Sequence, residues 1–155
     1  MKMKKISIIG ALCIIIVLAL TGCGKKKAIT TSEFISKTES LGFTTTDATS
    51  QYAEFDHVKE ATIAQHPDGY QIEFYSIDNE ANTEGMFTTN KNTFEASKGN
   101  VSAESSVSLG NYATYSLTSD GSYMYLCRVD TTLLYIHVEE TYKDSVKDVI
   151  KELGY

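Results

Sequence analysis

The stretch that decides the fold is residues 112–139, YATYSLTSDGSYMYLCRVDTTLLYIHVE. Apolar and polar residues alternate along most of it, which is the pattern of half-buried strands. Asp120-Gly121 predicts a two-residue hairpin turn, because both residue types accept the backbone that such turns need. Asp130-Thr131-Thr132 predicts a second turn, of three residues. Three strands are therefore expected, at about 101–117, 122–129 and 133–139, with a break or bulge in the first at Gly110-Asn111.

These registers distribute the side chains over two faces of a sheet. One face is aliphatic and suits packing against helices; it holds Leu117, Met124, Leu126, Leu134, Ile136 and Val138. The other face is rich in tyrosine; it holds Tyr112, Tyr123, Tyr125, Cys127, Tyr135 and His137. Tyrosine presents a large apolar ring with a polar tip, which suits stacking on sugars, on a peptide or on another protein. The predicted ligand-binding residues are Tyr112, Tyr123, Tyr125, Tyr135 and His137. The alternative is that a helix or the N-terminal segment covers this face and the tyrosines belong to the core.

Helices and one further hairpin are expected in the rest of the chain. Pro67-Asp68-Gly69 predicts a turn between strands 58–66 and 70–77. Thr30 and Glu33 form a capping box for a first helix, and Thr141 and Asp144 do the same for the last one. A helix from about residue 78 to 98 lies between the two groups of strands, while residues 43–57 are either a loop or an edge strand. The order αββαβββα predicts one α+β domain, with a mainly antiparallel sheet of about five strands and helices packed on one face.

The first two dozen residues have a different character. A basic start precedes an apolar run from Ile6 to Leu20, and the run leads into Leu20-Thr21-Gly22-Cys23. This arrangement resembles the lipobox of bacterial lipoprotein precursors. The resemblance implies that Cys23 receives a diacylglycerol and becomes the new N-terminus after cleavage. An uncleaved transmembrane helix is the first alternative, because about 20 apolar residues cross a bilayer. A plain secretory signal is the second.

The lipobox resemblance divides the chain into three parts. Residues 1–22 would be a signal peptide, residues 23–29 a lipidated cysteine with a short basic linker, and residues 30–155 the α+β domain. Two or more acyl chains, palmitate among them, hold a protein on a membrane almost without release. The expected location is therefore the extracytoplasmic side of the cell membrane. The lysines at 25–27 suit anionic headgroups there.

The net charge bears on nucleic-acid binding, and the number of cysteines bears on disulfide formation. Without Lys2, Lys4 and Lys5, the chain has 11 basic residues against 20 acidic ones, a formal charge of −9 instead of −6. Nucleic acid is not an expected partner, because its binding needs clustered Lys and Arg. Cys13 would be lost with the signal and Cys23 lipidated, which leaves Cys127 without a disulfide partner. A lone thiol in a strand is typically a small buried apolar group.

No sequence motif indicates a catalytic or metal site. The histidine and carboxylate pairs Asp56-His57 and His66-x-Asp68 lie at opposite ends of one predicted strand, too far apart for a shared metal. His137 could activate Cys127 across adjacent strands, but no third group is indicated. No cofactor is expected. The sequence therefore predicts a lipoprotein with a non-enzymatic binding domain for a protein or cell-envelope component. The alternatives are an accessory subunit of a membrane complex and a hydrolase acting on envelope polymer, with a concave pocket that joins His137 or carboxylates to tyrosines.

Overall fold

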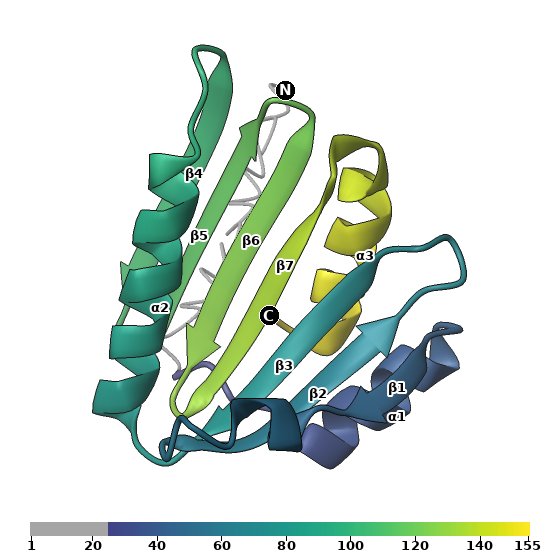
Figure 1. The fold of residues 1–155 in the computed structure, drawn as a ribbon, viewed down its shortest axis with the longest axis vertical. Helices are drawn as coiled ribbons and strands as arrows, with labels where there is room; N and C mark the ends of the chain where they lie inside the picture. Colours follow the sequence, from purple (N-terminus) through teal and green to yellow (C-terminus); the bar gives the residue numbers. More distant parts are fainter. Residues whose placement is uncertain (1–24) are drawn as a thin grey trace, which may run out of the picture.

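The computed structural model describes residues 25–155, in which seven strands form one antiparallel sheet (Figure 1). Along the sheet the strands follow the order β1-β2-β3-β7-β6-β5-β4. The strands are β1 (Thr44–Asp47), β2 (Val58–Gln65), β3 (Gln71–Ile77), β4 (Ser102–Leu109), β5 (Tyr112–Ser119), β6 (Ser122–Val129) and β7 (Thr132–Glu139). The helices are α1 (Thr31–Ser40), α2 (Glu80–Ala96) and α3 (Lys143–Leu153), with short 3-10 turns η1 (Thr49–Tyr52) and η2 (Glu140–Tyr142).

The predicted fold class is wrong in strand number and element order. The expected strand 101–117 is two strands, β4 and β5, because Gly110 adopts a φ of +55° and turns the chain back on itself. Leu109 then pairs with Tyr112. A further short strand, β1, forms at the opposite edge of the sheet, within the segment for which loop and edge strand were both open. The sheet therefore has seven strands instead of about five.

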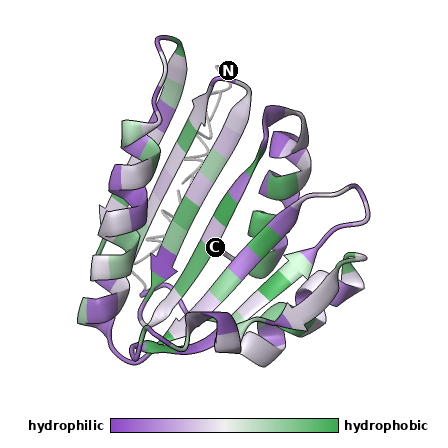
Figure 2. Ribbon diagram, in the orientation of Figure 1, coloured by the Kyte–Doolittle hydropathy of each residue, from purple (hydrophilic) through white to green (hydrophobic). Residues whose placement is uncertain are grey.

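Helices cover both faces of the sheet, whereas one face was expected. On the first face, α1 and α3 bury Phe34, Val146 and Leu153 against Phe74 and Ile136. The Phe34 and Phe74 rings stack with their centroids 4.8 Å apart. On the second face, α2 buries Phe87 and Phe94 against an apolar floor that includes Tyr115, Leu117, Leu126 and Leu133. Figure 2 shows hydrophobic and hydrophilic residues alternating along several of the strands, and burial on both sides gives the sheet two separate cores.

The pairing of β6 with β7 is displaced by one residue from the predicted register. Val129 pairs with Thr132, so the connecting turn contains two residues, Asp130 and Thr131, instead of three. Asp130 accepts a φ of +49° there, and its carboxylate accepts a hydrogen bond of 2.9 Å from the Asn111 side chain. Side chains alternate between faces along a strand, so a displacement of one residue moves every side chain of β7 to the other face.

Of the two helix caps predicted near the ends of the domain, the structure has one. Thr30 and Glu33 form the predicted capping box of α1. The predicted cap of α3 at Thr141 is wrong, because α3 begins at Lys143 after η2 and no side chain caps it. Ahead of α1, the Lys26 backbone exchanges two hydrogen bonds with the Asn111 side chain, and Ile29 is buried. Residues 26–29 thus pack on the domain.

The lipobox and Cys23 lie outside the described residues. Within residues 25–155, no helix is long and apolar enough to span a bilayer.

Candidate functional site

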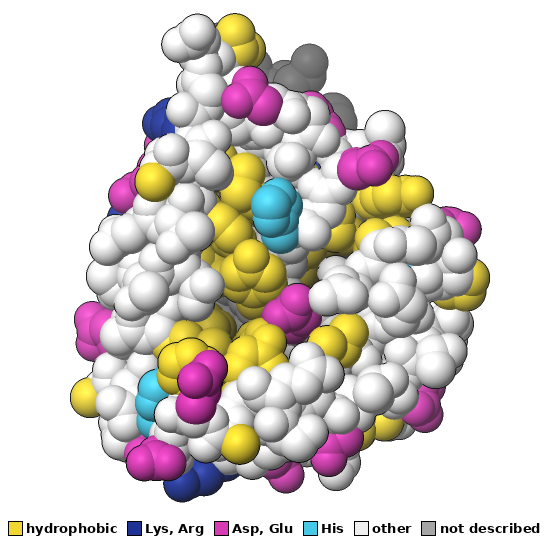
Figure 3. Space-filling view, viewed as in Figure 1, with side chains coloured by type: hydrophobic (Ala, Val, Ile, Leu, Met, Phe, Trp, Pro, Cys, Tyr) yellow, Lys and Arg dark blue, Asp and Glu magenta, His cyan; other side chains and the backbone are white. Residues whose placement is uncertain are grey.

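The face of the sheet that carries α2 is only partly covered. α2 packs mainly against β6 and runs along the β4–β5 side of the sheet, so much of β7 and β3 is visible beside it (Figure 1). The space-filling view shows this side hollowed next to α2, with apolar side chains in the hollow and histidine and acidic side chains among them (Figure 3). We call this hollow, between α2, η1 and the open surface of β3 and β7, the groove.

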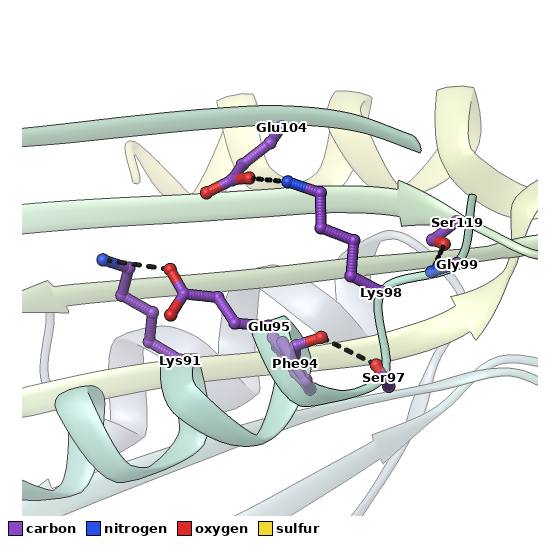
Figure 4. A network of polar contacts seen from close by, with 8 residues as sticks. All are labelled: Lys91, Phe94, Glu95, Ser97, Lys98, Gly99, Glu104 and Ser119. Carbon is purple, nitrogen blue, oxygen red and sulfur yellow. Dashed lines mark hydrogen bonds and ion pairs between the residues drawn. The ribbon is translucent and has the colours of Figure 1, made fainter. Parts of the chain in front are cut away.

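α2 forms one wall of the groove and is held at its C-terminal end. Lys98 pairs with Glu104 of β4, and the Gly99 backbone donates a 2.8 Å hydrogen bond to the Ser119 hydroxyl (Figure 4). Within the helix, Lys91 and Glu95 form an ion pair of 3.3 Å. The contacts of Lys98 and Gly99 hold the C-terminal end of the helix at β4 and β5. The position of this wall of the groove is therefore fixed by contacts within the protein.

A hydrogen-bonded network crosses the floor of the groove. The Tyr52 and Tyr75 hydroxyls lie 2.7 Å apart, and Tyr75 donates its one proton in a short hydrogen bond to Glu73, so Tyr52 is the donor to Tyr75. The other oxygen of Glu73 accepts a 2.8 Å hydrogen bond from Gln71. Burial and the bond to Glu73 raise the pKa of Tyr75 far above its usual range. At neutral pH this network therefore has a neutral Tyr75 that donates to the carboxylate.

An apolar cavity of about 420 Å³ lies at the η1 end of the groove. Its lining includes Tyr52, Phe55, Val58, Gly85, Met86 and Thr89. Phe55 is 44% exposed at the edge of this cavity. This end of the groove can accept an apolar group.

A polar cavity of about 620 Å³ lies at the opposite end. Its lining includes the carboxylates Asp68, Glu73 and Glu139 and the rings of Tyr135, His137 and Tyr142. No Lys or Arg is among the lining residues. Burial and the charge of Glu73 raise the pKa of Tyr135, as expected for a hydroxyl in a negative potential. This end can accept a cation or a hydrogen-bond donor.

The predicted tyrosine-rich face does not exist as one surface. Tyr135 and His137 lie in the groove, whereas Tyr123, Tyr125, Cys127 and Tyr112 contribute to or pack against the core formed with α1 and α3. The correction follows from the β6–β7 register, which places Met124 opposite His137 and Leu126 opposite Tyr135. Tyr123 is 3% exposed and Tyr125 and Tyr135 are half-buried.

The same register separates Cys127 from His137. Cys127 pairs with Leu134 and is buried in the core on the far side of the sheet, so the contact that the sequence left open between the two side chains does not form. Burial raises the pKa of the Cys127 thiol to about 11, which keeps it protonated at neutral pH. The His137 ring instead lies 5.9 Å from the Phe94 ring.

Three residues of the groove floor were not predicted, namely Tyr52, Glu73 and Tyr75. The alternation in Gln71-Ile-Glu-Phe-Tyr-Ser-Ile77 does place Glu73 and Tyr75 on one face of β3. That signal is weak, because nothing local shows which face a helix will cover. Within residues 25–155, no group of three or more His, Cys, Asp or Glu residues is placed to hold a metal ion.

Comparisons with known proteins identify no family. No protein-family model matches the chain, and no curated protein matches it in sequence. A solved structure with some likeness is that of a GTP-binding regulator from Thermotoga maritima, which is 15% identical. The match covers 85% of this chain and 93% of that chain, with a TM-score of 0.46. A likeness of this size identifies neither a family nor a ligand.

Proposed function

We propose that this protein is a lipoprotein, anchored through Cys23 on the extracytoplasmic side of the cell membrane, whose domain binds a protein or cell-envelope component in the groove beside α2. The observation that carries the binding role is the groove, in which an apolar and a polar cavity flank one hydrogen-bonded network. Each cavity falls within the range of about 300–1,000 Å³ that is typical of ligand sites. The lipid anchor rests on the lipobox resemblance.

The contact between Lys26 and Asn111 supports binding close to the membrane. It attaches the chain to the β4–β5 turn only three residues after Cys23. Three extended residues reach at most about 10 Å. A lipid on Cys23 would hold that end of the domain within about this distance of the membrane surface. The partner is then expected in the membrane or just outside it.

Photo-crosslinking in living cells tests the groove. A photo-reactive phenylalanine analogue would replace Thr89, which is exposed and lines the apolar cavity, or Lys147, which is exposed on α3. We expect a discrete adduct from position 89 that disappears when Gly85→Phe fills the cavity. An adduct from position 147 with none from position 89 would refute the groove and favour an accessory subunit that docks through another surface.

Substitution of Cys23 tests the anchor. The Cys23→Ser chain is expected to lose incorporation of labelled palmitate and to retain its uncleaved signal peptide, because diacylglycerol transfer precedes cleavage at a lipobox. A wild-type chain that keeps residues 1–22 and takes up no palmitate would instead indicate a transmembrane helix.

The polar cavity gives the hydrolase alternative one specific observation. It joins His137, three carboxylates and Tyr135 in one concave site, as a hydrolase would require. Against this, no hydrogen bond between residues 25–155 orients the His137 ring, which instead lies beside Phe94. Release of reducing ends from purified envelope polymer, abolished by both His137→Ala and Glu73→Gln, would establish a hydrolase.

A further inference from the structure

The polar end of the groove is suited to a cation. Three carboxylates from three different segments, Asp68, Glu73 and Glu139, surround a cavity that also presents tyrosine rings. Glu73 and Glu139 take part in none of the ion pairs between residues 25–155. A cation beside a carboxylate and over an aromatic ring is stabilised by both. A lysine over a tyrosine ring already occurs elsewhere in the protein, where Lys26 Nζ lies 5.1 Å from the Tyr112 ring centroid.

The apolar end contains a glycine that the fold does not require. Gly85 lies in the interior of α2, where glycine is less stable than alanine. Its φ is not positive, and a Cβ added there would meet no atom within 4 Å beyond its chain neighbours and the backbone of α2 itself. Neither backbone geometry nor packing therefore explains this residue. It lines the apolar cavity, and a side chain at this position would take up space in that cavity.

The distance between the two ends suits an extended chain. Glu73 and Ile77 are four residues apart on β3, and Ile77 pairs with Val58 in the lining of the apolar cavity. Four residues of a strand span about 13 Å. A polypeptide segment in extended form covers this distance with the same number of residues. A small organic cation fills one end only.

We propose that the groove binds an extended polypeptide segment that carries an apolar side chain and, about four residues away, a lysine or arginine side chain. The apolar side chain enters the cavity beside Gly85, and the cation lies among Glu73, Glu139 and the tyrosine rings. This proposal rests on the proposed function and specifies the chemistry of its ligand.

Calorimetric titration of the full-length chain, purified in detergent, tests the proposal. The probe is the acetylated and amidated peptide Ser-Leu-Ala-Ala-Ala-Lys-Ser, compared with versions in which Gln or Glu replaces Lys. We expect the Lys peptide to bind about tenfold more tightly than the Gln peptide and the Glu peptide to bind most weakly. The advantage of Lys is expected to shrink in high salt, because added ions screen exposed charges.

Matched variants locate the two contacts. Glu73→Gln is expected to reduce the affinity for the Lys peptide to that for the Gln peptide, and Gly85→Phe to weaken both peptides about tenfold. Glu152→Gln, on the exposed surface of α3, is the control and should change neither. Because Glu73 also accepts hydrogen bonds from Tyr75 and Gln71, Glu139→Gln provides a second test outside that network.

Two results would overturn the proposal. Equal binding of the Lys and Glu peptides would exclude cation recognition, and tetramethylammonium chloride that binds as tightly as the Lys peptide would exclude the polypeptide. Failure of all peptides, together with an adduct from position 89 that Gly85→Phe abolishes, would refute the polypeptide class and leave the groove as a binding site. Loss of that adduct as well would refute the proposed function itself.

Discussion

Replacement of Gly85 by alanine should make the protein more stable. Gly85 lies in the interior of α2, a helix of 17 residues, and an added methyl group would contact nothing beyond its chain neighbours and the backbone of that helix. Glycine in a helix interior is less stable than alanine by about 0.5–1 kcal/mol, because the unfolded chain loses more freedom when it folds. Since no clash offsets this term, we expect the full gain. For a domain of this size it corresponds to a rise in Tm of about 2–4 °C.

Urea unfolding followed by circular dichroism measures the effect, with Gly154→Ala as the matched control. Gly154 ends α3 with a φ of +83°, where a Cβ is strained, so the same substitution should destabilise by about 1 kcal/mol. The two substitutions are thus expected to change the free energy of unfolding in opposite directions, for reasons that do not depend on a ligand. A Gly85→Ala protein that is less stable than the wild type would refute the argument that the fold does not need this glycine.

The same variant connects stability with binding. If the glycine keeps the apolar cavity open, Gly85→Ala should weaken the Lys peptide while it stabilises the free protein. Such an opposition between stability and function is common where a site needs a locally unfavourable residue. A variant that is more stable and binds as well as the wild type would show that the cavity beside Gly85 does not hold the apolar side chain.

Three further predictions concern the two cores. Arg128, the one arginine of the sequence, is 9% exposed, and its Nε has no hydrogen-bond partner among the described residues. Arg128→Met should therefore raise the free energy of unfolding in urea by about 1–3 kcal/mol. A lower free energy of unfolding would indicate that the guanidinium is paired in solution. Burial raises the pKa of the Cys127 thiol from 9.0 to about 11, so the unfolded chain loses this proton first and stability should fall between pH 9 and pH 11. Cys127→Ala should show a smaller fall over that interval, and an identical one would contradict the assignment. Tyr155→Phe removes the hydroxyl that bonds to Thr132 in the core and should cost about 1 kcal/mol, whereas an unchanged Tm would show that water replaces this bond.

Local signals in the sequence were sufficient for several elements. The capping box of Thr30 and Glu33 identified the start of α1, and Pro67-Asp68-Gly69 identified the turn between β2 and β3. Asp120-Gly121 predicted both the turn and the register, since Ser119 does pair with Ser122 and Leu117 with Met124. These features depend on residues that are close in sequence, so their energetics can be judged without the rest of the fold.

The wrong predictions about strands concern two segments whose residues fit more than one local backbone structure. Gly110-Asn111 can form a bulge within one strand or a turn between two, and the structure has the turn. Asp130-Thr131-Thr132 can close a hairpin with two or three residues. The choice is made by Asn111, whose side chain binds Asp130 across 19 positions, and by Thr131, whose carbonyl accepts a 2.8 Å hydrogen bond from Ile77 of β3.

The candidate site was also predictable only in part, because most of its residues are brought together by contacts between distant parts of the chain. Two of its residues, Tyr135 and His137, were predicted, but for a different face and with the wrong neighbours. Glu73, Tyr75 and Tyr52 come together only because β3 pairs with β7 and η1 packs beside β2. Cys23 and the lipid anchor stay predictions, since they lie outside the described residues.

The sequence by itself determined the acidic charge, most of the helix and strand positions and the turns whose chemistry is local. Only the tertiary structure decided how the hairpins joined into one sheet, which side chains of β7 shared a face with those of β6, and which surface was left open. The physical reason is the two-residue period of a strand: a single displacement at Asp130 moves the side chains of β7 from one face to the other. The groove exists because α2 packs mainly against β6 along one side of the sheet, and that position is set by contacts with β4, β5 and β6 that no local pattern contains.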